Sequence, residues 1–412
     1  MAALCYIEIL MSKPVATRAQ IGIGGCRISE RAKQLVMDVL DSNRLSAGPM
    51  IDRFEREVAR LHDCRYGLFT NSGTSALQIA LAALKERYGW ADGDEVLVPA
   101  VTFVATSNVV LYNGLKPVFV DVEPDMYCID PALIEERITP RTRAIMPVHI
   151  AGLPCDMDPI LEIARRRNLR VVEDSAETMF VRYKGRAVGS MSDIGCFSTY
   201  VAHIITTGVG GLCVTSDAEL IVMLKSLMNH GRDSIYTRID DDADKEGQAL
   251  FEIADRRFSF VRFGFSYRCT EMEAALGIAQ LETREADWMR RCEIAGRFNN
   301  AFEPLEGRLQ LPRVRDGAEH AWMFYPLVLT DSGLSRRELI QYLEDHQIET
   351  RYLLPLLNQP AYQKHFGELE PQYPVARKLN RDAFYIGCHA GMTDEEVDHV
   401  IETVHAFFRG RA

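Results

Sequence analysis

Apolar positions in the first two thirds of the chain gather in short runs that alternate with segments of helical period. The runs are rich in β-branched residues, which favours strands, and the intervening segments have the spacing of helices. Apolar strands that alternate with helices are typical of a mostly parallel sheet covered on both faces. The pattern predicts strands at 94–100, 116–122, 143–150 and 169–176, and helices at 75–89, 107–114 and 157–168.

The pattern changes near residue 270. It then predicts one or two long helices over 270–302, strands at 320–329 and 348–353, a helix at 335–347, and a closing amphipathic helix capped by Thr393. A chain of 412 residues is long enough for one large and one smaller domain. We therefore expect an N-terminal tail at 1–20, a large α/β domain at 21–270 and a small C-terminal α+β domain at 271–412.

The charge and the cysteine content of the chain indicate which partners it can bind and in which cellular compartment it works. The formal net charge of -11 argues against a nucleic-acid partner, which would need a basic face. The 10 cysteines include no CxxC pair, so the sequence predicts no metal site and a reducing compartment. The apolar start lacks a basic leading segment and a cleavage site, and no later run is long enough to span a bilayer. The expected location is cytoplasmic, with no membrane partner.

The stretch "TNSGTSALQIAL", residues 70–81, is the first candidate for chemistry. Ser72, Gly73 and Thr74 follow a strand and open a helix, where backbone N–H groups attract a phosphate. A capped helix with a glycine turn explains the same residues, so this motif is weak by itself.

Three further candidates follow predicted strands. Asp174, in "VVEDSAE", stands where open α/β sheets bind ligands and could hold a protonated pyridine nitrogen, or cap a helix. Phe103 could stack on a flat cofactor, or pack in the core. His149 could bind a ligand, although a lone histidine of this kind is usually structural. Glu177 lies three residues after Asp174 and is otherwise a surface acid.

The segment "STYVAHIITTGVGG", residues 198–211, places His203 between a strand-like piece that ends at Ser198 and a glycine-rich loop. A histidine with access to a ligand can transfer protons near neutral pH. It cannot form a covalent link to a carbonyl carbon in the manner of lysine, because imidazole has no primary amine.

Six blocks in this order resemble the DegT/DnrJ/EryC1/StrS sugar aminotransferase family. They are "LSAGPMIDRFE", "NSGTSALQIAL", "VLVPAVTFVATSNVVLYNG", "PVHIAGLP", "VVEDSAE" and "FSTYVAHIITTGVGG". The resemblance implies an enzyme of the fold-type-I, aspartate aminotransferase-like class that uses pyridoxal 5'-phosphate or pyridoxamine 5'-phosphate. It also implies a homodimer with shared active sites that acts on nucleotide sugars.

The resemblance assigns roles to particular residues. A segment that reaches into the neighbouring subunit's site is represented by "GFSYRCTEMEAALG", where Ser266 replaces the usual Asn and Arg268 is expected to bind substrate together with His149. The residues implied to contact the cofactor are Ser72, Gly73, Thr74, Phe103, Asp174, Glu177, Ser198 and Ser266.

Two departures from the family's aminotransferases indicate a particular branch. His203 replaces their lysine, and Glu177 replaces their usual glutamine. The family's 3-dehydratases, which act on nucleotide-linked 4-keto-6-deoxy sugars, have histidine and an acidic residue there. The dispersed cysteines favour the branch without an iron–sulfur cluster, which is the GDP-linked one. Val209 departs from both branches, which usually have glutamate at that position.

The resemblance then implies C3 dehydration of a nucleotide-linked 4-keto-6-deoxy sugar. His203 is the expected general base, Glu177 tunes the site, and glutamate is the expected amino donor. Two alternatives stay open at this point. One is another lysine-free reaction of the same family, and the other is a non-catalytic homologue that binds sugar nucleotides.

Overall fold

Seven strands form the large sheet, in the order β1-β9-β8-β5-β4-β2-β3. The computed structural model describes residues 20–233 and 242–410, so the predicted tail at 1–20 lies outside the described residues except for its last one. All neighbouring strands are parallel except the two pairs that include β9. The strands are β1 (Tyr66–Thr70), β2 (Glu95–Pro99), β3 (Lys116–Val120), β4 (Thr142–Ile145), β5 (Arg170–Asp174), β8 (Ile194–Ser198) and β9 (Gly211–Thr215).

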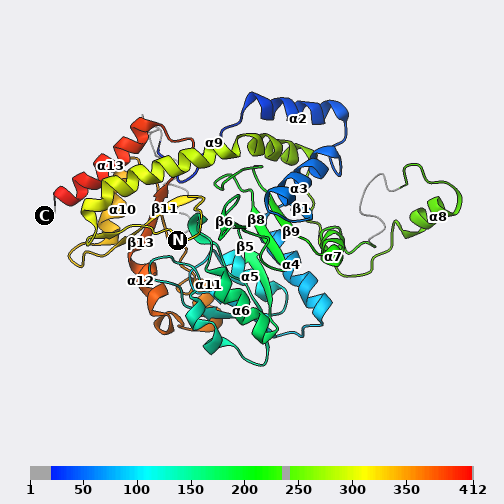
Figure 1. Ribbon diagram of the computed structural model, residues 1–412, viewed down its shortest axis with the longest axis horizontal. Helices are drawn as coiled ribbons and strands as arrows, with labels where there is room; N and C mark the ends of the chain where they lie inside the picture. Colours follow the sequence, from blue (N-terminus) through cyan, green and yellow to red (C-terminus); the bar gives the residue numbers. More distant parts are fainter. Residues whose placement is uncertain (1–19, 234–241, 411–412) are drawn as a thin grey trace, which may run out of the picture.

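Helices cover both faces of this sheet (Figure 1). On β8 and β9, Cys196 and Cys213 face the core that contains α4, whereas Phe197 and Leu212 face the core that contains residues of α2, α3 and α9. This alternation is the period-2 pattern of a strand buried on both sides. The helices of this part are α2 (Glu30–Ser42), α3 (Pro49–Leu61), α4 (Gly73–Tyr88), α5 (Val104–Tyr112), α6 (Met157–Arg167), α7 (Ala218–Met228) and α8 (Gly247–Arg256).

A single helix, α9 (Glu271–Phe302), connects the two halves of the molecule (Figure 1). It begins with a capping box between Thr270 and Glu273. Ala274 near its start packs with α2 and α3, and Phe298 near its end packs in the core of the C-terminal part. Helix α9 therefore contributes residues to both cores, and it begins at the predicted domain boundary of 270/271.

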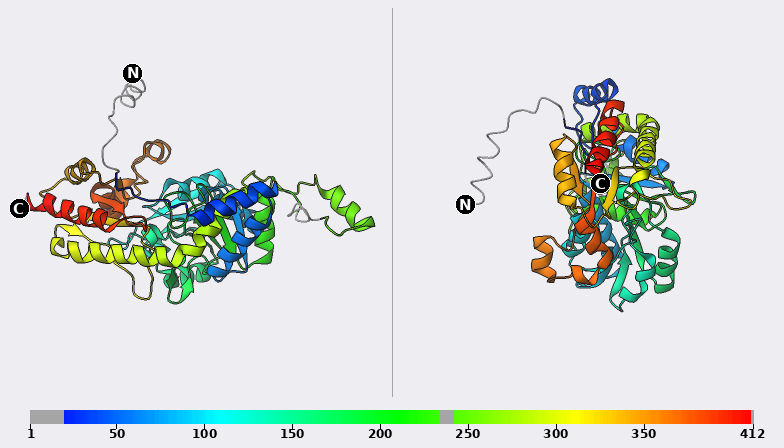
Figure 2. Two further views of the ribbon diagram at one scale, coloured as in Figure 1. Left: turned by 90° about the horizontal axis from the view of Figure 1, so that it is seen from above. Right: turned by 90° about the vertical axis from the view of Figure 1, so that its left-hand side faces the viewer.

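The C-terminal part contains a four-stranded antiparallel sheet in the order β10-β11-β13-β12. Figure 2 shows this part beside the large sheet, with α8 projecting from the opposite end of the molecule. Its elements are β10 (Leu309–Gln310), β11 (Phe324–Leu329), α10 (Arg336–Asp345), β12 (Thr350–Tyr352), α11 (Pro360–Phe366), α12 (Pro374–Asp382), β13 (Ala383–Gly387) and α13 (Asp394–Arg409). A small hairpin of β6 (Arg182–Tyr183) and β7 (Arg186–Ala187) precedes β8.

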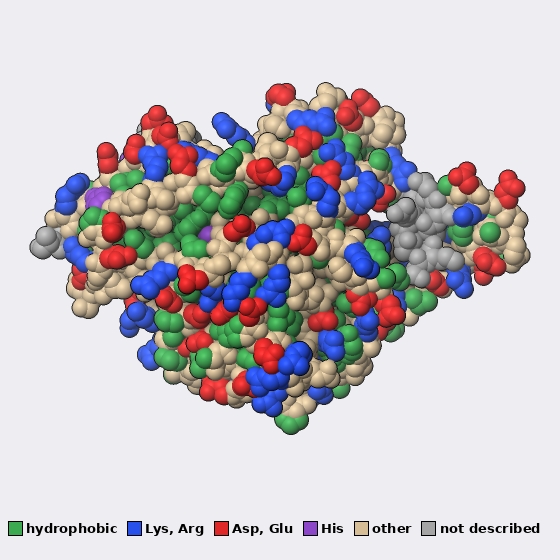
Figure 3. Space-filling view, in the orientation of Figure 1, with side chains coloured by type: hydrophobic (Ala, Val, Ile, Leu, Met, Phe, Trp, Pro, Cys, Tyr) green, Lys and Arg blue, Asp and Glu red, His purple; other side chains and the backbone are tan. Residues whose placement is uncertain are grey.

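The surface carries charges of both signs. Acidic and basic side chains are interspersed over the face shown in Figure 3, so the basic residues form no continuous patch on that face. Within residues 20–233 and 242–410, each helix is too short or too polar to cross a lipid bilayer.

Candidate active site

Asp174 ends β5 at the carboxyl edge of the parallel strands, where open α/β sheets bind ligands. Its side chain is buried, and its two oxygens accept hydrogen bonds from the Thr106 hydroxyl at 2.7 Å and the Ala176 N–H at 3.2 Å. Burial raises the pKa of Asp174, and these two donors oppose the rise. Within the described part of the chain the carboxylate forms no ion pair.

Glu177 follows on the turn after β5 and is also buried. Its Oε2 accepts the Ala151 N–H at 2.7 Å. Burial raises the pKa of Glu177 to about 8, and the negative charge of Asp174 adds to the rise. At neutral pH Glu177 is therefore mainly a neutral acid, which can donate a hydrogen bond to a ligand.

His203 lies in the loop between β8 and β9, and the fold places it beside the Asp174–Glu177 turn. Its ring contacts the Ser198 carbonyl, with Nδ1 at 3.4 Å from the oxygen, and it also interacts with the backbone of Ala176. Desolvation by the surrounding protein lowers the pKa of His203 to about 4, although both backbone contacts oppose the fall. The side chain is only half-buried, so a neutral imidazole is available to accept a proton.

The residues expected to bind a phosphate also come together. Ser72 caps α4 by accepting the Ser75 N–H at 3.0 Å, and Thr74 is exposed in the first turn. A Cβ atom on Gly73 would lie 2.8 Å from the Ser198 Cβ, so only glycine allows the end of β8 to approach the start of α4 this closely. The result is a helix N-terminus flanked by hydroxyl groups, which is a favourable environment for an anion.

Phe103 stands at the N-cap of α5, four residues after the end of β2, and is 59% exposed. The alternative that this ring packs in the core is therefore excluded. An exposed aromatic ring beside the carboxyl edge of the sheet is free to stack on a flat ligand.

The structure corrects the expectation for His149. Its side chain is fully buried, and Nε2 lies 2.9 Å from Oε2 of the buried Glu173 while Nδ1 accepts the Cys155 N–H at 3.0 Å. Desolvation alone would raise the pKa of Glu173, but the hydrogen bonds from His149 and the Gly189 N–H hold it below its usual value. Because both ring nitrogens are engaged, the His149 side chain has no polar atom left to bind a substrate. Its role is to hold Glu173 of β5 in place.

Ser266 and Arg268 lie on an exposed strand-like segment before α9. The Arg268 guanidinium donates to the Ser266 hydroxyl at 3.0 Å and lies 3.2 Å from Nε2 of His230. The backbone between them accepts the Asn71 N–H at 2.9 Å, which places the segment beside the loop that leads to Ser72. Both side chains are open to a ligand or to a second subunit.

The sequence profile of the DegT/DnrJ/EryC1/StrS aminotransferase family matches residues 26–405. The chain belongs to this family. Among curated relatives, it is 35% identical over 388 residues to the spore coat polysaccharide biosynthesis protein SpsC of Bacillus subtilis (strain 168), with 93% of this chain and 96% of that protein covered. It is 33% identical over 411 residues to dTDP-4-dehydro-2,6-dideoxy-D-glucose 3-dehydratase of Saccharopolyspora spinosa, with 95% and 87% covered.

Among solved structures, E. coli GDP-4-keto-6-deoxy-D-mannose-3-dehydratase with bound hydrated PLP matches with a TM-score of 0.84 and 25% identity. The match covers 94% of this chain and 100% of that one. The family and the fold expected from the sequence are thus confirmed, and so is the expectation of an enzyme family that uses pyridoxal phosphate.

The described residues of this family member fit the cofactor. The buried Asp174 carboxylate, which has no cationic partner there, suits a protonated pyridine nitrogen. The exposed Phe103 ring suits the face of a pyridine ring, and the helix start at Gly73 suits its phosphate.

Two side chains that orient Asp174 were not predicted from the sequence. Thr102 and Thr106 are buried, and their hydroxyl oxygens lie 2.7 Å apart. The signal was present in "VTFVAT", because a threonine at the end of a strand and another four residues later share one side of a helix start. The pattern alone does not reveal what the two hydroxyls contact.

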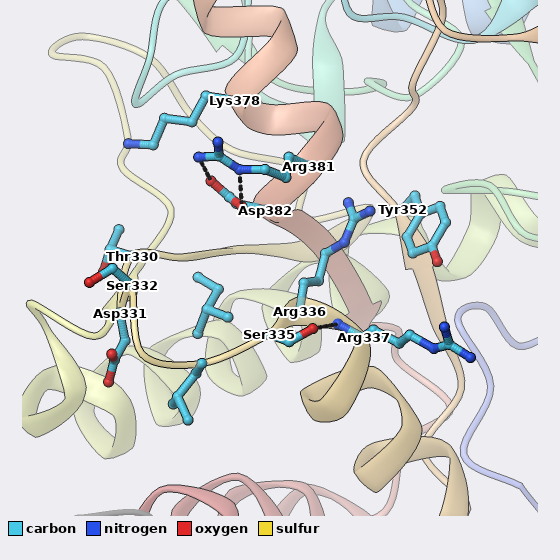
Figure 4. Close-up of a pocket in the computed structure, with 12 residues that line it drawn as sticks. Thr330, Asp331, Ser332, Ser335, Arg336, Arg337, Tyr352, Lys378, Arg381 and Asp382 are labelled. Atoms are coloured by element: carbon cyan, nitrogen blue, oxygen red, sulfur yellow. Dashed lines mark hydrogen bonds and ion pairs between the residues drawn. The ribbon is translucent and has the colours of Figure 1, made fainter.

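A separate cavity of about 570 Å³ lies in the C-terminal part, between α10, α12 and β12 (Figure 4). It is lined by none of the predicted site residues. Two of its arginines already have structural contacts: Arg336 donates to the carbonyls of Asn380 and Ala383 at 2.8 Å, and Arg381 pairs with Asp382. The cavity is therefore separate from the candidate site around Asp174 and His203.

Proposed function

We propose that the protein catalyses the C3 dehydration of a nucleotide-linked 4-keto-6-deoxy sugar, with pyridoxal 5'-phosphate or pyridoxamine 5'-phosphate as cofactor. The observation that carries the proposal is the position of His203. An imidazole, rather than an amine, faces the turn that holds Asp174 and Glu177. A relative and a solved neighbour that are named as 3-dehydratases add support.

Non-covalent contacts hold the cofactor in this proposal, because His203 cannot attach it. Asp174 pairs with the pyridine nitrogen and Phe103 stacks on the ring. The phosphate is bound by Ser72, Gly73, Thr74 and Ser198, around the start of α4. When bound, pyridoxamine phosphate would supply the amine that condenses with the sugar ketone and, on losing a proton, the electrons that expel the C3 hydroxyl.

The protein's own part in the chemistry is proton transfer. His203 begins as a neutral base, because desolvation keeps the pKa of its imidazole near 4 in the free protein. An anionic cofactor and substrate raise the proton affinity of a nearby imidazole, so binding prepares His203 to accept a proton and then deliver it to the leaving hydroxyl. Glu177, neutral near pH 7, donates a hydrogen bond within the same site.

The proposal extends to partners and location. Glutamate is the proposed amino donor, and a solved 3-dehydratase that resembles this chain contains a trapped PLP-glutamate geminal diamine. Ser266 and Arg268, which are exposed here, are proposed to contact cofactor and substrate across a homodimer. The proposed location is the cytoplasm, without nucleic-acid or membrane partners, and the division into domains at 270/271 is retained.

A second candidate is another lysine-free reaction of the same family. Val209 favours it, because this side chain is 50% exposed in the His203 loop and replaces the usual glutamate. With valine in place of glutamate, the loop that carries His203 has no carboxylate at residue 209.

One assay separates the candidates. Purified protein is given pyridoxal phosphate and glutamate, followed by a panel of 4-keto-6-deoxy sugar nucleotides. Conversion of the cofactor to its amine form, ammonia release and a product lighter by one oxygen atom are expected for the dehydratase. An aminated product without ammonia release would favour the second candidate, and failure to bind the cofactor would favour a non-catalytic homologue.

A further inference from the structure

We propose that Thr106 and Thr102 form a hydroxyl relay that positions Asp174 toward the pyridine nitrogen of the cofactor. The inference rests on the proposed cofactor contacts but not on the identity of the sugar. Thr106 Oγ1 donates to Asp174 Oδ2 at 2.7 Å, and Thr102 Oγ1 lies 2.7 Å from Thr106 Oγ1. All three side chains are at most 3% exposed, so water does not compete for these bonds.

Proton counting gives the relay a direction. Each threonine hydroxyl has one proton to donate. If Thr106 donates to an ionised Asp174, the short contact with Thr102 is satisfied only when Thr102 donates to Thr106. In this arrangement the relay stabilises the anionic form of Asp174, which is the form that a protonated pyridine nitrogen requires.

The two hydroxyls are not needed to cap their own helix. Helix α5 begins after Phe103, and no side chain caps its N-terminus. Thr106 lies in the first turn of α5, so its bond to Asp174 also fixes the distance between that turn and β5. Phe103, the proposed stacking residue, and Asp174, the proposed partner of the pyridine nitrogen, are thereby held in one arrangement.

This positioning matters more in a site without an attachment lysine. A covalent link would hold the cofactor even if the Asp174 carboxylate turned away. Here the ion pair, the phosphate contacts and the stacking ring are the proposed means of retention. Weakening the charge-assisted bond between Asp174 and the pyridine nitrogen is therefore expected to raise the dissociation constant of the cofactor.

The test measures binding of pyridoxal phosphate by absorbance titration to wild type, Thr106→Val, Thr106→Ser and Thr102→Val. Thr106→Val is expected to weaken binding about 10- to 100-fold, the range for a hydrogen bond to a charged group. Its bound cofactor is expected to show less of the absorbance of the protonated pyridine ring. Thr106→Ser, which keeps the hydroxyl, is expected to restore both, and Thr102→Val to give a smaller loss.

Thr215→Val is the matched control, because Thr215 is also buried and its hydroxyl donates to a backbone carbonyl, that of Asp193, at 2.8 Å. It should bind the cofactor like wild type. Wild-type affinity and spectrum in Thr106→Val would overturn the relay, whereas a wild-type protein that binds no cofactor would overturn the proposed function instead. If Thr106→Val does not fold, the comparison of Thr102→Val with Thr215→Val decides the question.

Discussion

Replacing Glu177 by glutamine tests the electrostatics of the site through protein stability. The glutamine keeps an oxygen for the Ala151 N–H, which Glu177 Oε2 accepts at 2.7 Å, but it cannot ionise. Burial and the charge of Asp174 raise the pKa of Glu177 from 4.5 to about 8. In the unfolded chain the carboxyl ionises near its ordinary pKa, whereas in the folded chain it keeps its proton until the pH approaches 8.

The sign of the effect follows from proton binding. Between pH 4.5 and 8 the folded wild type binds more protons than the unfolded chain, so its free energy of unfolding falls as the pH rises. The pKa difference of 8 − 4.5 = 3.5 corresponds to about 5 kcal/mol across this window. Glu177→Gln lacks this loss, so its stability relative to wild type should increase with pH by that order of magnitude.

Urea unfolding of both proteins without added cofactor, at half-unit pH steps from 4.5 to 8.5, measures the difference. Titrating groups that do not interact with residue 177 are common to the two proteins and cancel in the comparison. Most of the relative gain should develop below pH 8, with a plateau above it. A difference between the two proteins that does not change with pH would refute the reasoning, since Glu177 would then ionise alike in both states.

Further variants probe individual parts of the site. His203→Asn should lower the rate of dehydration by about 10²- to 10⁴-fold without changing the affinity for the cofactor, and an undiminished rate would identify another base. His203→Lys should form a covalent link to the cofactor that borohydride reduction traps on the chain. Gly73→Ala should weaken cofactor binding and lower the free energy of unfolding in urea by about 1–3 kcal/mol, because the new Cβ would crowd β8. Gly296→Ala, in an open position on α9, should raise the free energy of unfolding by up to about 1 kcal/mol. Equal behaviour of the two variants would contradict the tight contact with β8. His149→Ala should cost about 1–3 kcal/mol, because the buried Glu173 loses one of its three hydrogen-bond donors, and the substrate KM should not change. A raised KM at wild-type stability would restore a binding role.

Much of the fold follows from local sequence pattern. The four strands predicted between residues 94 and 176 correspond to β2, β3, β4 and β5, and the closing helix to α13. Most ends agree within two residues, but β4 ends at Ile145 instead of residue 150. These elements have a clear periodic spacing of apolar residues or a recognisable capping residue. The strand β13 was not predicted, because "AFYIG" lies between a helical segment and a glycine and has too few residues to show a period.

Sequence by itself also determined which chemistry is available. Imidazole in place of an amine excludes covalent attachment at residue 203 in any fold, and the order of the six blocks identified the family before any geometry was known. Such conclusions depend on functional groups and on their order along the chain, and neither changes when the chain folds.

Only the tertiary structure decided how these groups meet. It showed that both ring nitrogens of His149 are engaged, although the His149 backbone N–H bonds to Asp174 in the neighbouring strand. It also revealed the two threonines that orient the Asp174 carboxylate. It also set the protonation of Glu177, since a pKa depends on burial and on charges brought from elsewhere in the chain. Contacts between residues far apart in sequence leave no periodic signal, so packing alone could assign these roles.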